Sequence, residues 1–163
     1  FAQDRYFAKQ AVRLAISASV LWLAITSVRA FPNYIPYFNE ASGGPKNGYK
    51  LLADSNLDWG QDLILLRDFL KDHPEIDELK FSYFGATNPE YYGVRCRYLL
   101  SPFYVREAEY NLYPHCKPIK GWVAISVNNY LGIYFENRDC YRWLDAYKPI
   151  YSIGHSIWIY RID

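Results

Sequence analysis

A dense run of side-chain oxygens, amides and one indole spans residues 54–62, in the sequence DSNLDWGQD. Carboxylates and amides hydrogen-bond hydroxyl groups, and a tryptophan ring stacks on apolar faces such as those of sugars. The candidate ligand-contacting residues in this run are Asp54, Asn56, Asp58, Trp59 and Gln61. A second group of candidates consists of Tyr91, Tyr92 and Asn128.

The same run has two interpretations that involve no such ligand. Asp54, Asn56 and Asp58 have the alternating oxygens of a calcium loop. However, Trp59 replaces the required glycine, and Leu65 stands where a bidentate glutamate belongs. Alternatively, Asp54 or Asn56 caps the following helix, while the later aspartates of the run oppose its positive N-terminal end. We favour capping over calcium binding.

Other chemical motifs are incomplete. The three histidines, His73, His115 and His155, lie in separate segments without metal-ligand spacing. The tripeptide that begins at Gly154 resembles the start of a nucleophile elbow, but Trp158 replaces the closing glycine. We therefore assign no catalytic residue and no metal ligand, and we expect no cofactor in this fragment.

Composition limits the class of protein. The chain has 163 residues, of which 51% are hydrophobic and 19% aromatic, which is ample for a packed core. A net charge of +1 leaves no basic excess for neutralising phosphates, so we expect no nucleic-acid partner. Because the chain begins with Phe and contains no Met, we expect it to be a piece of a longer protein.

An apolar segment near the start predicts a membrane span. Leu14–Val28 carries no charge and lies between Arg13 and Arg29. Its length is short for a span of about 20 residues, but apolar flanks and outward-reaching arginine side chains extend it. A buried helix of a soluble protein and a secretory signal are the alternatives. The basic residues on the two flanks nearly balance, so charge does not predict the orientation.

Strand and helix patterns alternate after a Pro/Gly-rich connector at 31–48. The expected strands are Tyr49–Ala53, Leu79–Phe84, Gly121–Val127 and two C-terminal strands joined at Gly154-His155, with an amphipathic helix at 61–76. We predict one N-terminal transmembrane helix within residues 1–30. A small three-layer, Rossmann-like α/β domain follows at 49–163, with a mostly parallel sheet and a C-terminal β-hairpin. Residues 95–120 interrupt this pattern as an inserted loop.

The three cysteines are Cys96, Cys116 and Cys140. In an oxidising compartment, we expect a disulfide between Cys96 and Cys116 that closes the inserted loop and leaves Cys140 as a buried thiol. In a reducing compartment, all three would be small apolar residues.

Four stretches resemble the C-terminal part of bacterial membrane glycosyltransferases related to protein O-mannosyltransferases. They are FPNYIPYFNEASGGPKNGYKLLADSNLDWGQDL, FSYFGATNPEYYG, GWVAISV and KPIYSIGHSIWIYRI. The resemblance runs from about Phe31 to the end, except for the inserted loop. It implies that a multi-span region upstream of Phe1 takes a sugar from a polyprenyl-phosphate carrier and holds the catalytic aspartate. Leu14–Val28 would then be the last span of a multi-pass cell-membrane protein.

The resemblance further implies that the α/β domain lies outside the cytoplasm, which favours the disulfide between Cys96 and Cys116. Our leading hypothesis is an accessory extracytoplasmic domain of such a transferase, itself not catalytic. Its expected partners are membrane lipid, the upstream transmembrane bundle and the sugar acceptor. The alternative is a membrane-tethered scaffold module that binds carbohydrate or protein without catalysis.

Overall fold

The computed structural model describes residues 2–103 and 115–163. It divides into two compact units, Phe1–Tyr34 and Ile35–Asp163. Most of the predicted connector therefore belongs to the second unit. The middle of the predicted inserted loop, residues 104–114, lies outside the described residues.

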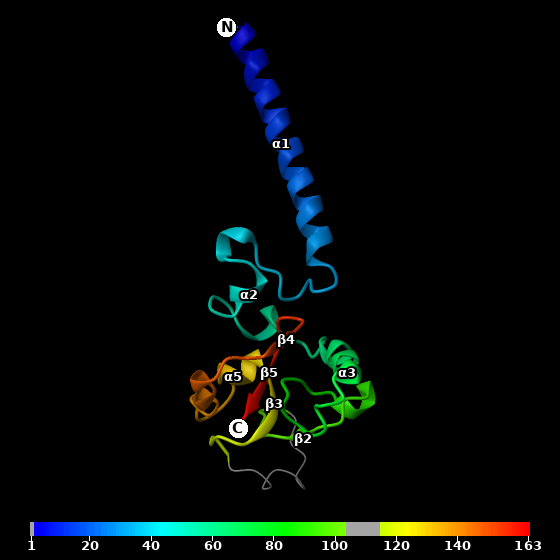
Figure 1. Cartoon of the computed structure of the whole chain (residues 1–163). Helices are drawn as coiled ribbons and strands as arrows, with labels where there is room; N and C mark the ends of the chain where they lie inside the picture. Colours follow the sequence, from blue (N-terminus) through cyan, green and yellow to red (C-terminus); the bar gives the residue numbers. More distant parts are fainter. Residues whose placement is uncertain (1, 104–114) are drawn as a thin grey trace. The chain divides into compact units, whose positions relative to one another are not determined.

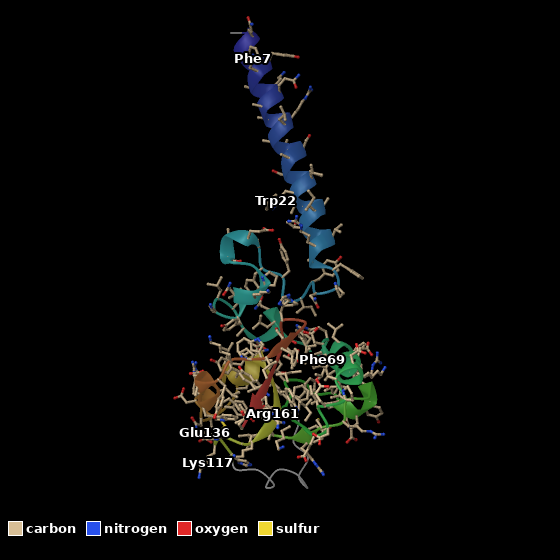
Figure 2. All side chains as sticks on the ribbon, in the orientation of Figure 1. Phe7, Trp22, Phe69, Lys117, Glu136 and Arg161 are labelled. Carbon is tan, nitrogen blue, oxygen red and sulfur yellow. A yellow bond between two sulfur atoms is a disulfide. The ribbon has the colours of Figure 1, made fainter. Side chains whose placement is uncertain are left out.

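The first unit consists mainly of helix α1, Ala2–Ala30 (Figure 1). Within it, Arg5–Ala30 has a mean hydropathy of 1.8, and this stretch is long and apolar enough to cross a membrane. Its apolar side chains surround the helix instead of lining one face, and Phe7 and Trp22 project outward from it (Figure 2). A helix that is apolar on all sides is more stable in an apolar environment than on the surface of a soluble domain.

Short helical turns occupy the start of the second unit. They are η1 (Glu40–Ser42), α2 (Pro45–Gly48) and η2 (Asp54–Asn56). Gly48 allows close packing here, because a Cβ on it would lie 2.0 Å from the Phe38 ring. The strand predicted at Tyr49–Ala53 is wrong, since this segment forms turns and leaves Leu51 and Leu52 exposed.

A five-stranded mixed sheet has the order β2-β1-β3-β5-β4 (Figure 1). Its strands are β1 (Leu79–Ser82), β2 (Arg97–Tyr98), β3 (Gly121–Ser126), β4 (Tyr151–Ile153) and β5 (Ile157–Ile162). β1 pairs in parallel with β2 and β3, while β5 pairs antiparallel with β3 and β4. The mixed α/β class and the C-terminal hairpin are thus confirmed, but the sheet is less parallel than we predicted.

Apolar clusters cover both faces of the sheet. Side chains alternate along a strand, so Ala124 faces one cluster while Val123 and Ile125 face the other. The first cluster contains Leu63 and Leu66 of helix α3, Leu63–Asp72. The second lies under η4, Arg142–Ala146, and beside α5, Val127–Tyr130, which follows β3 directly.

A further turn, η3 (Pro89–Tyr92), is capped by Asn88, whose side chain accepts a hydrogen bond from the Glu90 N–H.

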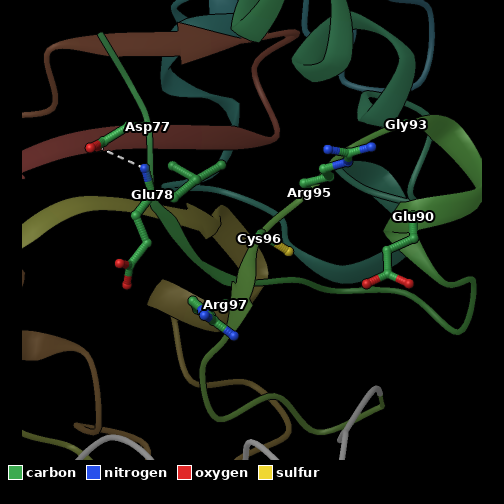
Figure 3. A pocket seen from close by; sticks show the side chains of 8 residues that line it. Asp77, Glu78, Glu90, Gly93, Arg95, Cys96 and Arg97 are labelled. Atoms are coloured by element: carbon green, nitrogen blue, oxygen red, sulfur yellow. Dashed lines mark hydrogen bonds between the residues drawn. The ribbon is translucent and has the colours of Figure 1, made fainter. Parts of the chain in front are cut away.

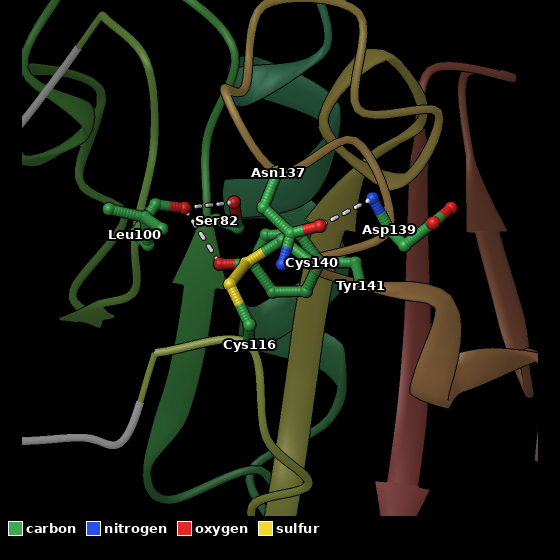
Figure 4. Close-up of a disulfide and its surroundings, with 7 residues drawn as sticks. All are labelled: Ser82, Leu100, Cys116, Asn137, Asp139, Cys140 and Tyr141. Carbon is green, nitrogen blue, oxygen red and sulfur yellow. Dashed lines mark hydrogen bonds between the residues drawn. A yellow bond between two sulfur atoms is a disulfide. The ribbon is translucent and has the colours of Figure 1, made fainter.

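The disulfide joins Cys116 to Cys140, so the predicted pairing of Cys96 with Cys116 is wrong (Figure 4). The sheet provides the physical reason. Cys116 and Cys140 both pack in the cluster under η4, with their Cα atoms 4.2 Å apart. Cys96 packs against the cluster on the opposite face, beside α3. Sequence spacing could not reveal this, because it depends on which face of the sheet each cysteine approaches.

Breaking this disulfide should destabilise the second unit. The bond joins two residues that are 24 positions apart in the sequence. Closing a loop of this length restricts the unfolded chain and thereby stabilises the folded state by about 3 kcal/mol. We expect dithiothreitol to lower the urea midpoint of the wild-type chain but not of Cys140→Ser, measured by circular dichroism. Cys96→Ser is the matched control and should remain sensitive to dithiothreitol. Insensitivity of both wild type and Cys96→Ser would contradict the observed pairing.

Candidate functional site

The run at residues 54–62 is held against the sheet by a clamp from Asn128. The side-chain Oδ1 of Asn128 accepts a hydrogen bond from the Asp54 N–H at 2.8 Å, and its Nδ2 donates to the Asp54 carbonyl at 3.1 Å. Asn128 itself is fully buried in α5. Asp54 has a φ of 61°, a left-handed conformation that aspartate tolerates better than most residues. The clamp thus fixes an unusual backbone at the start of the run.

A second set of hydrogen bonds shapes the turn after Leu57. The Gln61 Oε1 atom accepts from the Trp59 N–H at 2.7 Å, and its Nε2 donates to the Leu57 carbonyl at 3.0 Å. The Trp59 indole Nε1 donates to the Ser55 carbonyl at 2.9 Å. The indole is oriented by this bond, yet 70% of Trp59 is exposed to solvent. An oriented and exposed indole is available to stack on a ligand.

The Asp58 carboxyl is buried at the centre of the site, with only 2% of the residue exposed. Its Oδ1 accepts from the Gly60 N–H at 2.7 Å, while its Oδ2 has no hydrogen-bond partner among the described residues. Burial raises the pKa of Asp58 to about 7, and the nearby Asp62 carboxyl adds to the rise. The Gly60 N–H opposes part of this rise, and so does the Ser126 hydroxyl, which lies near the carboxyl but outside hydrogen-bond geometry. A carboxyl with such a pKa changes charge near neutral pH.

Asp62 lies directly before α3 but does not cap it with its side chain. Its Oδ2 instead accepts a hydrogen bond from the Ser156 hydroxyl at 2.6 Å. Burial raises the pKa of Asp62 as well. Gly154 permits this arrangement, because a Cβ there would lie 2.1 Å from the Asp62 carboxyl. The predicted capping of this helix by Asp54 or Asn56 is also wrong, since both residues form the separate turn η2.

These elements enclose a pocket of about 320 Å³ at the carboxyl ends of the parallel strands β1 and β3. It is lined by Asp54, Ser55, Asp58, Trp59, Phe84, Gly85, Ala86, Thr87 and Phe103. We call it the Trp59 pocket. The carboxyl edge of parallel strands is where open α/β sheets bind ligands. Ser126, at the end of β3, supports its wall by accepting a hydrogen bond from the Phe84 N–H at 3.0 Å.

Aromatic rings adjoin the two carboxyl groups of the pocket. The Phe84 and Phe103 ring centroids are 5.0 Å apart, and Tyr134 lies 5.1 Å from Phe103. The Tyr134 hydroxyl donates to the Asp54 Oδ2 at 2.9 Å. Sequence analysis missed all three rings. Phe84 could have been found, because it is the last residue of a predicted strand, and Asn128 follows the end of the neighbouring predicted strand. Phe103 and Tyr134 lie in irregular segments without such a signal.

Of the predicted contact residues, the structure brings Asp54, Asp58 and Trp59 together in the Trp59 pocket. Asn128 and Gln61 support this site through the hydrogen bonds described above. The exposed Asn56 side chain borders a different hollow, beside Leu51 and Leu52. Tyr91 and Tyr92 lie on η3, outside the lining of the Trp59 pocket, and 87% of Tyr91 is exposed.

A larger hollow of about 730 Å³ lies beside β2 and η3 (Figure 3). Its charged lining residues are Asp77, Glu78, Glu90, Arg95 and Arg97, all of which are exposed. Acidic and basic groups both line this hollow, and none of the described lining residues is aromatic. Exposed charges of both signs are well solvated and require no ligand. The Trp59 pocket is therefore the better candidate site.

Within residues 2–103 and 115–163, no group of three or more His, Cys, Asp or Glu side chains is placed to hold a metal ion. Comparison with known proteins gives no family: the sequence matches no protein-family model, no curated protein and no solved structure. The resemblance to membrane glycosyltransferases therefore stays a prediction from sequence motifs.

Gly60 should be required for the geometry of the turn. It has a φ of 81°, and a Cβ on it would lie 2.1 Å from the Tyr83 hydroxyl oxygen. Gly44, with a φ of 74° and nothing within 4 Å of an added Cβ, is the matched control. We expect Gly44→Ala to cost about 1 kcal/mol from backbone strain and Gly60→Ala at least about 1 kcal/mol more from displaced Tyr83. Urea unfolding measures both, and equal losses would contradict the close approach.

Asp58 should make the protein less stable as the pH rises. An unfolded aspartate has released its proton by about pH 5, whereas folded Asp58 keeps it until about pH 7, so unfolding releases a proton in this range. Its shift from 3.8 to about 7 corresponds to a loss of about 4 kcal/mol between pH 4 and 7. We expect Asp58→Asn to remove most of this loss and to raise the urea midpoint at pH 8.

The control for this experiment is Asp72→Asn, which changes an exposed aspartate at the end of α3. It should leave the pH dependence of the urea midpoint as in the wild-type chain. Asp62 should still contribute a slope of the same sign in Asp58→Asn, because its pKa is also raised. A wild-type slope in Asp58→Asn would show that Asp58 is not the group that titrates.

Proposed function

We propose that Ile35–Asp163 is a saccharide-binding accessory domain of a multi-pass membrane glycosyltransferase, held outside the cytoplasm. The observation that carries this proposal is the Trp59 pocket, where an exposed indole lies with two carboxyl groups. Tryptophan rings stack on sugar faces, and carboxyl oxygens accept hydrogen bonds from hydroxyl groups. A pocket with one flat apolar surface and adjacent acceptors therefore suits a ring that carries hydroxyl groups.

The energetics of Asp58 favour a ligand-binding role over a purely structural one. A buried acceptor without a partner costs about 1–3 kcal/mol, and Asp58 Oδ2 is such an atom among the described residues. Groups that weaken the fold in this way are concentrated at functional sites. A ligand hydroxyl or amine that donates to Oδ2 would offset the cost.

Two further features support the membrane and compartment parts of the proposal. Helix α1 is long and apolar enough to cross a membrane. The Cys116–Cys140 disulfide is typical of proteins that face an oxidising compartment. The motifs that resemble lipid-linked sugar transferases supply the proposed parent reaction, in which the polyprenyl-phosphate sugar is handled upstream of this chain. Apolar clusters on both sheet faces likewise support the predicted three-layer, Rossmann-like arrangement.

Removal of the Trp59 ring should weaken saccharide binding. We expect Trp59→Ala in the 163-residue chain, kept in detergent, to lower the affinity about tenfold, which is the loss of about 1.4 kcal/mol of stacking. Saturation-transfer NMR with mannose, glucose and glucosamine as separate probes measures the affinity. The unfolding midpoint should change little, because 70% of Trp59 is exposed.

Tyr91→Ala is the matched control for this test. Tyr91 is an exposed aromatic residue of the same unit that lies outside the pocket lining. Its removal should leave the binding of each saccharide unchanged. Wild-type affinity in Trp59→Ala would overturn the proposed binding site, and so would the failure of all three saccharides to bind the wild-type chain.

A further inference from the structure

The Trp59 pocket holds acidic side chains without a basic counterpart among the described residues. Asp54 and Asp58 line it, and Asp62 lies close enough to raise the pKa of Asp58. Within residues 2–103 and 115–163, the lining contains no Lys, Arg or His side chain. None of these three aspartates forms an ion pair with the described residues. A phosphate-bearing ligand would be repelled here, whereas a positively charged group would be attracted.

In its charged form, the Asp58 carboxyl offers the pocket an acceptor and not a donor. Asp58 Oδ2 is buried without a hydrogen-bond partner in the part of the chain that the structure describes, although Oδ1 of the same carboxyl accepts from the Gly60 N–H. Only 2% of Asp58 is exposed to solvent, yet the residue contributes to the pocket lining. An ammonium group carries three donors and a compensating charge, so it satisfies this oxygen better than a neutral hydroxyl does.

The aromatic rings of the site favour the same kind of ligand. Phe84 and Phe103 line the pocket, and Tyr134 lies 5.9 Å from the Phe84 ring. Trp59 adds an exposed indole to this group. The faces of aromatic rings attract cations, most strongly for tryptophan, and rings combined with carboxylates recognise ammonium groups in proteins. The pocket thus combines two independent features that attract a cation.

We infer that the Trp59 pocket binds the ammonium group of an amino sugar, with Asp58 Oδ2 accepting a hydrogen bond from it and the Trp59 indole covering the sugar ring. This inference rests on the proposed saccharide-binding function and adds the chemical class of the ligand. It assigns the pocket to an amine-bearing saccharide and not to the anionic lipid-linked donor.

Binding should depend on pH through Asp58. The groups around its carboxyl are Asp54 in the pocket lining, Asp62 across the turn, Ser126 from β3 and Tyr83 after β1. None of them is basic, so the carboxyl keeps its proton until about pH 7 without ligand. An ammonium group favours the charged carboxylate. We therefore expect glucosamine to bind on the order of tenfold tighter at about pH 7 than at about pH 5.5, while its amine stays largely protonated.

The experiment compares three probes with the full chain in detergent by saturation-transfer NMR: glucosamine, glucose and ethanolamine. We expect glucosamine to bind at least about tenfold tighter than either other probe, since only it carries both the ring and the ammonium group. Asp58→Asn should remove the preference for glucosamine over glucose. Asp72→Asn, the exposed control, should leave both affinities unchanged.

The outcomes separate this inference from the function on which it rests. Equal binding of glucose and glucosamine, still dependent on Trp59, would overturn ammonium recognition and leave saccharide binding in place. Ethanolamine binding as tightly as glucosamine, with no binding of glucose, would overturn the assignment to a sugar and with it the proposed function. Failure of all three probes to bind the wild-type chain would overturn both.

Discussion

The two hydrogen bonds between the Asn128 side chain and the Asp54 backbone are the constraint on which the candidate site depends. They join residues 74 positions apart in the sequence, at distances of 2.8 and 3.1 Å. Because Asn128 follows β3, the clamp fixes the run at residues 54–62 over the carboxyl edge of the sheet. Both the N–H and the carbonyl of Asp54 are satisfied by one amide, which is why a backbone with a φ of 61° can persist there. The clamp therefore helps to hold Asp54, Asp58 and Trp59 together in the pocket lining.

Stability and ligand binding place opposite demands on the buried acids. Asp58 and Asp62 are buried members of the run, each with a pKa raised by burial. Buried carboxyl groups without a basic partner weaken a fold when they are charged. The surrounding structure tolerates them because apolar clusters on both faces of the sheet supply the main stabilisation. The same lack of a basic neighbour leaves the charge available to a ligand. A site of this kind is expected where the fold is not optimised for stability alone.

Local sequence patterns predicted the elements whose burial is periodic. The helix α3, the strands β1 and β3 and the C-terminal hairpin all follow from hydrophobic spacing and turn residues. The pattern failed at Tyr49–Ala53, where an apolar run ends in exposed leucines. It also failed for the disulfide, because the face of the sheet that a cysteine approaches is a tertiary property. The contact between Asp54 and Asn128 was equally beyond local analysis, although both residues were noticed individually.

The covalent loop closed by Cys116 and Cys140 contains β3 and α5, and therefore Ser126 and Asn128. The strand at the centre of the sheet and the residue that clamps the pocket thus belong to one cross-linked ring. Because the bond restricts the unfolded chain over this segment, its reduction favours unfolding of the same residues that form the wall and the clamp of the pocket.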